Sequence, residues 1–333
     1  MKILITGATG FLGRAICEEF GGDEFEVFTI SRKPMPEGNS EKHFQIDIAD
    51  SESARQIESL PKIDAVIHAA GLAHRFNKTD RKEFWQVNVE GTRNVVERAS
   101  KLNAGHFVLI SSVAVYGNSG VRKQNPQPIN ENSLCSPTGD YAESKYEAEK
   151  TARQICSKNR VRLTVLRPAT IIGEGDPGNL LRLIKIIDKN RFVWIGDGEN
   201  LKSLIYKRDV AAACRLITSS NASDNDVDKG AVKIYNAAAP SLKMREIVGE
   251  IAGALGKSIP KRTIPKEFII EGLKTAERLT GLRKIGRLSE TVAKWISDEN
   301  FSGEKLLDEF GFAPRTSVKE AIRREVDFYK RTT

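Results

Sequence analysis

A tyrosine and a lysine, Tyr141 and Lys145, lie four residues apart in a segment with a helical pattern, so their side chains would share one face of the helix. An ammonium beside a phenol favours the phenolate and would lower the pKa of Tyr141 from about 10 toward neutrality. Ser112 follows an apolar run at 106–111 and could hold a reacting oxygen in line with Tyr141. These three side chains suit removal of a proton from a carbinol while a hydride leaves the same carbon. Each also has a structural interpretation, as helix-surface residues and a strand-end hydrogen-bonding group.

A glycine-rich turn near the N-terminus could hold the hydride acceptor. Residues 6–13 read T-G-A-T-G-F-L-G, with Gly7, Gly10 and Gly13 placed between an apolar run at 3–6 and a helical pattern at 11–20. In a dinucleotide-binding turn the first glycine allows a tight bend, the second lets the backbone approach the pyrophosphate, and the third lets helix and strand pack closely. The free N–H groups of the helix N-terminus then face the anion. Phe11 and Leu12 belong to the same predicted cofactor contact.

The residues after the next two strands bear on which cofactor is used. Enzymes that use NAD usually place an acid about 20 residues past the glycines, whereas this chain has Ser31 and Arg32. A hydroxyl and a guanidinium suit a 2′-phosphate, so this pair favours NADP over NAD, although an arginine that stacks on adenine would serve either cofactor. Asp47 and Ile48 could contact the adenine ring. Asp47 could equally cap a helix that begins near Ser51.

The elements that would position these side chains alternate along the first half of the chain. Apolar runs rich in Val, Ile and Phe predict buried strands at 3–6, 26–30, 43–47, 65–69, 106–111 and 162–166. Helical patterns fall between them at 11–20, 51–59, 82–102 and 141–158, and a helical pair begins near 302. This order predicts an α/β fold with a Rossmann-type doubly wound parallel sheet and a smaller C-terminal α+β substrate domain. We expect the cofactor domain to span 1–167 with a returning segment at about 202–240, and the substrate domain to span 168–201 and 241–333.

Composition excludes several other classes of protein. The chain has 333 residues, of which 40% are hydrophobic and 29% charged, and it has no apolar run long enough to span a membrane. Its four cysteines are far apart, which argues against a disulfide framework or a metal site and fits a cytoplasmic protein. The formal net charge is +8, but no nucleic-acid-binding motif accompanies it, so a solvated basic surface explains most of the charge.

The order of these motifs resembles the extended short-chain dehydrogenases/reductases, in particular the NAD-dependent epimerase/dehydratase group that acts on nucleotide sugars. The sequence is most similar to proteins like UDP-glucose 4-epimerase, a subgroup that includes UDP-sugar 4-keto reductases. The resemblance covers nearly the whole chain. Its motifs are T-G-A-T-G-F-L-G at 6–13, H-A-A-G at 68–71, N-V-E-G-T at 88–92, S-S-V-A-V-Y-G at 111–117, Y-A-E-S-K at 141–145, L-R-P at 166–168, Y-K-R-D-V at 206–210 and F-G-F-A-P-R-T-S-V at 310–318.

The resemblance implies roles for further residues. It makes Tyr141 the general acid/base, with Lys145 also donating to the nicotinamide ribose and Ser112 orienting the oxygen. On the substrate side it implies that Asn179 contacts the diphosphate region, and that Lys202 stands where 4-epimerases usually have arginine. Further cofactor contacts are implied at Ala69, Ala70, Gly71, Asn88, Ser111 and Pro168, and further substrate contacts at His74 and Arg283, or Arg287 in place of the latter.

Two departures from the family pattern narrow the reaction. Family dehydratases have an acid pair directly after the catalytic hydroxyl residue, but this chain has Val113 and Ala114 there, and neither can transfer a proton. Members that epimerise at carbons 3 and 5 commonly have a cysteine at the position of Val113. The remaining chemistry is hydride transfer at a single carbinol, which we expect to be carbon 4 of a hexose.

The sequence therefore favours an NAD(P)-dependent UDP-4-keto-sugar reductase, because the Ser31-Arg32 pair suits a cofactor that exchanges during turnover. The alternative is a UDP-sugar 4-epimerase, which can keep NAD bound. A non-catalytic dinucleotide-binding regulator is a more distant alternative, disfavoured by the intact Ser112, Tyr141 and Lys145. Family members often form homodimers through the helices expected at 82–102 and 141–158. We expect no bound metal and no nucleic-acid partner.

Overall fold

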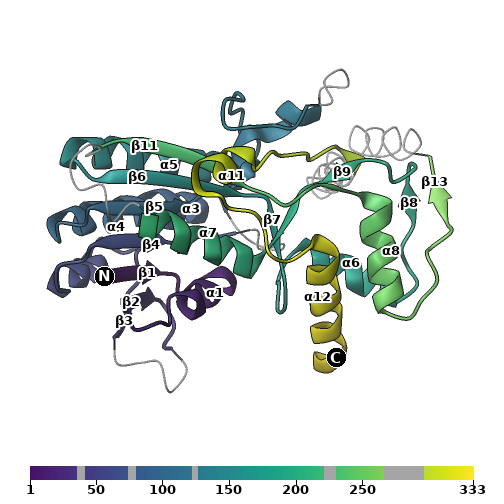
Figure 1. Ribbon diagram of the computed structural model, residues 1–333, viewed down its shortest axis with the longest axis horizontal. Coiled ribbons are helices and arrows are strands. Elements are labelled where there is room, and N and C mark those ends of the chain that lie inside the picture. The colour runs from purple at the N-terminus through teal and green to yellow at the C-terminus, as the bar shows by residue number, and fades with distance from the viewer. Residues whose placement is uncertain (36–41, 74–79, 122–126, 221–229, 266–295) are drawn as a thin grey trace.

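A seven-stranded parallel sheet forms the centre of the larger part of the molecule (Figure 1). The structure is a computed structural model that describes residues 1–35, 42–73, 80–121, 127–220, 230–265 and 296–333. The strand order is β11-β6-β5-β4-β1-β2-β3, and each neighbouring pair is parallel. The strands are β1 (Lys2–Thr6), β2 (Glu26–Ser31), β3 (His43–Gln45), β4 (Ala65–His68), β5 (His106–Ile110), β6 (Arg162–Pro168) and β11 (Val232–Ala237). This order confirms the doubly wound Rossmann-type fold expected from the sequence.

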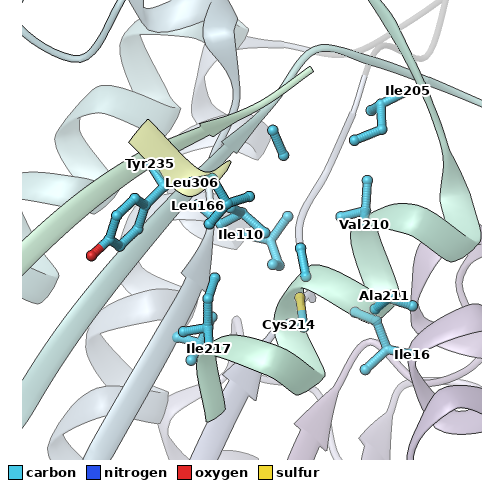
Figure 2. Packing of buried hydrophobic residues seen from close by; sticks show 14 of the residues in the cluster. Ile16, Ile110, Leu166, Ile205, Val210, Ala211, Cys214, Ile217, Tyr235 and Leu306 are labelled. Carbon is cyan, nitrogen blue, oxygen red and sulfur yellow. The ribbon is translucent and has the colours of Figure 1, made fainter. Parts of the chain in front are cut away.

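Helices cover both faces of this sheet, because its strands are apolar on both sides. On one face α1 (Phe11–Glu19) and α7 (Lys207–Ser220) pack against the strands. Figure 2 shows Ile16 of α1 beside Ala211 of α7, and Ile110 and Leu166 of the sheet belong to the same apolar cluster. On the other face α4 (Gly91–Lys101) and α5 (Asp140–Asn159) bury a second apolar cluster. The strand order reverses at β1, between β2 and β4, and ligands of open α/β sheets bind beyond the carboxyl ends of strands at such a point.

A third apolar cluster forms the core of the remaining part of the chain. Its helices are α6 (Asn179–Asp188), α8 (Met244–Ala254) and α12 (Val318–Thr332), and they lie away from the large sheet in Figure 1. Three strand pairs accompany them: β7 (Thr170–Ile172) with β10 (Leu204–Tyr206), β9 (Leu201–Lys202) with β12 (Leu242–Lys243), and β8 (Trp194–Ile195) with β13 (Thr263–Ile264). The exact residue boundaries expected for two domains stay a prediction.

Several expected elements differ in detail. The helix expected at 82–102 consists of α3 (Arg81–Phe84), a π-helical turn (Trp85–Glu90) and α4. The segment expected to be helical at 51–59 begins as α2 (Ser51–Ala54) and ends as a 3₁₀ turn (Arg55–Ser59), and residues 113–121 also form a 3₁₀ helix. The expected pair of C-terminal helices is confirmed as α11 (Glu304–Phe310) and α12, separated at Gly311, which has a φ of 65°.

Helix α12 carries a buried carboxyl group. Glu325 is 1% exposed, and its Oε2 accepts a hydrogen bond of 3.2 Å from the backbone N–H of Gly173. Its Oε1 has no hydrogen-bond partner within the described part of the chain. Burial, together with the neighbouring negative charge of Asp176, raises the pKa of Glu325 to about 9. The folded protein therefore holds a proton on this carboxyl at neutral pH, whereas the unfolded chain releases it.

We predict that Glu325→Gln stabilises the protein in mildly alkaline solution. The folded-state pKa lies above the unfolded one, so the stability that protonated Glu325 contributes is fully present below about pH 4.5 and is lost as pH rises toward 9. Glutamine keeps the shape and cannot ionise. Urea unfolding at pH 5 should show little difference from wild type, and at pH 8.5 the variant should be more stable by about 1–3 kcal/mol. The exposed neighbour variant Glu320→Gln should show no such trend, and a Glu325→Gln difference that does not change with pH would contradict the assignment.

Candidate active site

The turn between β1 and α1 has the geometry of a phosphate-binding turn. Gly7 has a φ of 73°, and a Cβ added there would lie 2.7 Å from backbone atoms of Ala70. A Cβ on Gly13 would lie 2.0 Å from the carbonyl oxygen of Gly7, and one on Gly10 would lie 3.0 Å from the same atom. No side chain caps the start of α1 at Phe11, so its first N–H groups stay available to an anion. Side chains are excluded where a pyrophosphate would need to approach, and these residues fit the dinucleotide expected from the sequence.

At the end of β2 the Ser31 side chain has partners within the protein. Its hydroxyl is buried and donates to the backbone carbonyl of Lys33 at 2.6 Å, with the His43 ring 3.3 Å away. Gln45 donates to the carbonyl of Arg32 at 2.9 Å, so this turn is held by internal hydrogen bonds. The Arg32 side chain itself is exposed. The structure leaves Arg32, rather than Ser31, as the group with a free path to a 2′-phosphate, and NADP preference stays a prediction.

Asp47 and Ile48 follow β3 at the same edge of the sheet. The Asp47 carboxylate accepts from the backbone N–H of Ala49 at 3.0 Å, while Asp50 caps α2 by accepting from Glu52. Asp47 is therefore not the helix cap that the sequence left open. Ile48 is buried against α4, where a Cβ on Gly91 would lie 3.0 Å from its Cδ1. The adenine contacts expected of both residues stay predictions.

The amide of Asn88 organises the loop after β4. Its Oδ1 accepts from the backbone N–H of Leu72 at 2.7 Å, and its Nδ2 donates to the Leu72 carbonyl at 3.1 Å and to the Ser144 hydroxyl at 2.9 Å. Ser144 in turn donates to the carbonyl of Tyr141. Both amide donors are thus used within the protein, so Asn88 positions residues 69–72 and the start of α5. The cofactor contact expected of Asn88 from the sequence stays a prediction.

The three predicted catalytic side chains lie around the carboxyl end of β5. Ser112 lies close enough to Tyr141 for its hydroxyl to lower the pKa of the phenol against the effect of burial. The Ser112 Oγ also accepts from the backbone N–H of Ala114 at 3.1 Å. Lys145 is buried, and its Nζ donates to the carbonyl of Ile110 at 2.9 Å. A reacting hydroxyl beside Ser112 and Tyr141 would therefore meet two hydroxyls on one side.

The electrostatics correct one expectation from the sequence. We expected Lys145 to lower the pKa of Tyr141, but burial raises that pKa, and the effect that opposes burial is the hydrogen bond with Ser112. The Lys145 amine donates to the Ile110 carbonyl, and its charge is not among the causes that shift the pKa of Tyr141. Burial also lowers the pKa of Lys145 to about 8, against the opposing negative charge of Glu149.

Sequence reasoning missed a buried ion pair directly behind Lys145. The carboxylate of Glu149 accepts from both sides of the Arg167 guanidinium, at 2.9 Å from Nε and 2.6 Å from Nη2. It also accepts from the hydroxyl of Ser111, a residue expected to contact the cofactor. The sequence shows that Glu149 continues the four-residue spacing of Tyr141 and Lys145 along α5, but it does not show the partner of Glu149.

Of the substrate residues predicted besides Ser112, the structure describes Asn179 and Lys202. Asn179 is exposed as the first residue of α6. Lys202 is buried in β9 and forms an ion pair of 3.2 Å with Glu299, which offsets part of the charge expected to meet a diphosphate. His74 and both arginine candidates, Arg283 and Arg287, lie outside the described residues.

The other predicted cofactor contacts occupy strand ends. Pro168 is the last residue of β6, and Ala69, Ala70 and Gly71 follow β4. A Cβ on Gly71 would lie 3.0 Å from the Lys145 amine, so this loop and the predicted catalytic lysine are close neighbours. Their contacts with a cofactor stay predictions.

Two further properties of the described residues concern metal binding and membrane insertion. They contain no group of three or more His, Cys, Asp or Glu side chains placed to hold a metal ion. None of the described helices has the length and apolar character needed to cross a membrane.

Known proteins similar to this chain include two curated relatives aligned over almost its full length. An N-acetyl-alpha-D-glucosaminyl-diphospho-ditrans,octacis-undecaprenol 4-epimerase from Escherichia coli O157:H7 is 29% identical, covering 98% of this chain and 95% of the relative. A 2-alkyl-3-oxoalkanoate reductase from Stenotrophomonas maltophilia is 27% identical, covering 97% of this chain and 98% of the relative.

A solved structure and a family model agree with these similarities. The complex of UDP-glucose 4-epimerase from Thermus thermophilus with NAD superimposes with a TM-score of 0.74 at 22% identity, covering 100% of each chain. At that identity the likeness establishes the fold. The model of the NAD dependent epimerase/dehydratase family matches residues 3–238, which is most of the chain. The chain therefore belongs to the NAD dependent epimerase/dehydratase family.

Proposed function

We propose that this protein catalyses NAD(P)-dependent hydride transfer at carbon 4 of a diphosphate-linked hexose, and that its net reaction is 4-epimerisation. The observation that carries the proposal is the grouping of three side chains at the end of β5, where the buried Lys145 donates to the Ile110 carbonyl and Ser112 lies close enough to Tyr141 to affect its pKa. Val113 and Ala114, which follow Ser112, offer no acid for elimination of water. The site thus supplies Tyr141 for proton transfer and no acid at residues 113 and 114. This set of groups suits oxidation and reduction of a single carbinol.

The turn at Gly7, Gly10 and Gly13 fits the pyrophosphate of the cofactor, whose nicotinamide ring accepts and returns hydride when it is bound. We assign the protein's own part of the reaction to two hydroxyls. Ser112 holds the carbon-4 oxygen, and Tyr141 in its deprotonated form takes its proton as the carbon–hydrogen bond breaks. Returning the proton from Tyr141 to the oxygen completes the reduction, and addition of hydride to the other face of the keto sugar inverts carbon 4.

Two considerations favour epimerisation over net reduction. The Escherichia coli relative, aligned over 98% of this chain, is named as a 4-epimerase. In addition, the buried hydroxyl of Ser31 donates to Lys33, so half of the pair that favoured NADP has another partner. The UDP-4-keto-sugar reductase stays the second candidate, because the exposed Arg32 side chain suits the 2′-phosphate of a cofactor that exchanges.

The carrier of the hexose is a separate question. The Escherichia coli relative is named for a sugar on a polyprenyl diphosphate, whereas the Thermus thermophilus structure is named for a UDP-sugar. A diphosphate is common to both carriers, and we assign its contact to Asn179, the exposed first residue of α6. We therefore propose the hexosyl diphosphate as the recognised unit.

Replacing Tyr141 with phenylalanine should lower kcat by at least about 10²-fold, since the variant loses the group that accepts the proton. The ring is retained, so its packing beside Phe84 and the binding of NAD should persist. The measurement is turnover of UDP-N-acetylglucosamine and of undecaprenyl-diphospho-N-acetylglucosamine, with NAD binding followed in parallel. A matched control on the same helix is Tyr146→Phe, which should keep wild-type turnover. Wild-type kcat in Tyr141→Phe would contradict the proposed role.

The state of the cofactor should distinguish the two candidate reactions. An epimerase regenerates its cofactor in each turnover, so the purified protein should release close to one NAD⁺ per chain when it is denatured. It should also convert substrate without added cofactor. Protein that carries no cofactor and consumes NADPH in proportion to product would instead establish the reductase, and Arg32→Ala should then weaken NADPH binding more than NADH binding.

The carrier should be settled by comparing kcat/KM for the two N-acetylglucosamine substrates named above. If the diphosphate is the recognised unit, Asn179→Ala should lower kcat/KM for whichever carrier is used, through KM more than kcat. An unchanged KM in that variant would exclude Asn179 from the diphosphate site.

A further inference from the structure

Three titratable side chains on α5 follow each other at intervals of four residues. Tyr141, Lys145 and Glu149 therefore lie on one face of the helix, directed toward the carboxyl ends of β5 and β6. Two of them have roles in the proposed function. The third, Glu149, is 6% exposed and has no role in the proton transfer described above.

Glu149 is held in place by neighbours from two strands. Ser111, directly after β5, donates to its Oε1, and Arg167 of β6 donates to both of its oxygens. The Arg167 guanidinium lies 4.9 Å from the centre of the Tyr116 ring, and the Tyr116 hydroxyl donates to Asn236 of β11 at 2.9 Å. The guanidinium and the hydroxyl together hold both oxygens of this carboxylate in place.

The surroundings of Lys145 explain what that charge could do. The amine is buried, and within the described part of the chain it takes part in no ion pair within 4.0 Å. Its hydrogen bond goes to the neutral carbonyl of Ile110. Burial therefore drives Lys145 toward the neutral amine, and only the negative charge of Glu149 opposes this tendency.

The other titratable groups around Lys145 cannot replace Glu149. His68 of β4 is buried between hydroxyls of Thr6 and Thr92, and its burial and the charge of Lys145 lower its pKa to about 3, so the ring is neutral. Burial raises the pKa of Tyr141 on α5, which disfavours a negative charge on this phenol. Arg167 of β6 is a cation and can only disfavour a second positive charge nearby.

We propose that Glu149 is a positioning residue for the proposed hydride transfer, and that its fixed carboxylate keeps Lys145 in the ammonium form at working pH. The Arg167 guanidinium holds Glu149 in place and also offsets part of its charge. This inference rests on the proposed function for its link to catalysis, but the charge state of Lys145 can be measured without any substrate.

The pKa of Lys145 should shift in opposite directions in different variants. This difference distinguishes an electrostatic role of Glu149 from a structural one. Glu149→Gln removes the negative charge and leaves Arg167 unbalanced, so the pKa of Lys145 should fall by about one unit or more. Arg167→Met removes the cation and leaves the carboxylate, so the pKa of Lys145 should rise. Ser111→Ala removes a hydrogen bond and no charge, so it should leave the pKa of Lys145 nearly unchanged.

The titration of Lys145 is followed by the ¹³C chemical shift of its Cε in ¹³C-lysine-labelled protein, with Lys145→Met used to assign the resonance. In parallel, the pH profile of kcat is recorded for each folded variant. We expect the alkaline limb of that profile to move in the same direction as the Lys145 titration. Glu147→Gln is the matched control, because Glu147 lies on the same helix but pairs with Lys150 at the surface.

Glu149→Gln leaves a buried guanidinium without its partner and could fail to fold. The double variant Glu149→Gln/Arg167→Met removes both charges at once, a change that buried ion pairs often tolerate. In this variant the pKa of Lys145 should still fall, because the negative charge that opposes the effect of burial has been removed. An unmoved Lys145 titration in either folded variant would overturn the proposal. A shifted titration with no turnover of any sugar substrate would instead retain the charge effect and reject the proposed function.

Discussion

A positive charge buried among neutral groups is the constraint on which this site depends. Lys145 lies between the loop after β4, the end of β5 and helix α5, where a main-chain carbonyl is its hydrogen-bond partner. Burial of an ammonium is costly unless another charge or a hydrogen-bond network offsets it. Glu149 provides that charge from one helical turn away, and Arg167 keeps Glu149 itself from being an isolated buried anion. The positions of helix α5, strands β5 and β6 and these charged side chains therefore depend on one another.

The parallel sheet makes this arrangement possible because the ends of its strands meet at one edge. The turn after β1 approaches the loop after β4 so closely that no Cβ is tolerated at Gly7. Asn88 ties that loop to α5 through Leu72 and Ser144, and a π-helical turn brings Asn88 to this position. The cofactor turn and the predicted proton-transfer groups thus share supports, so a change at one of them is transmitted to the other.

Features that depend on local spacing could be predicted from the sequence, and features that depend on tertiary burial could not. The glycines at 7, 10 and 13 and the four-residue interval from Tyr141 to Lys145 are local, and the structure places both as expected. The pKa of Tyr141 depends on which way the Lys145 amine points, and sequence spacing does not determine that direction. The pairing of Glu149 with Arg167 joins residues on a helix and a strand, so only the folded chain shows it.

The same distinction bears on Ser31 as a cofactor signal. In the sequence a serine beside an arginine resembles a phosphate-binding pair, because both side chains can donate hydrogen bonds. In the fold the serine lies at the buried end of β2 and donates to the Lys33 carbonyl, which shapes the turn that presents Arg32. A hydroxyl with an internal partner must lose that bond before it can bind a phosphate, so its contribution to cofactor affinity is reduced. Selectivity for a 2′-phosphate would therefore have to come from Arg32, whose exposed guanidinium has no comparable desolvation cost.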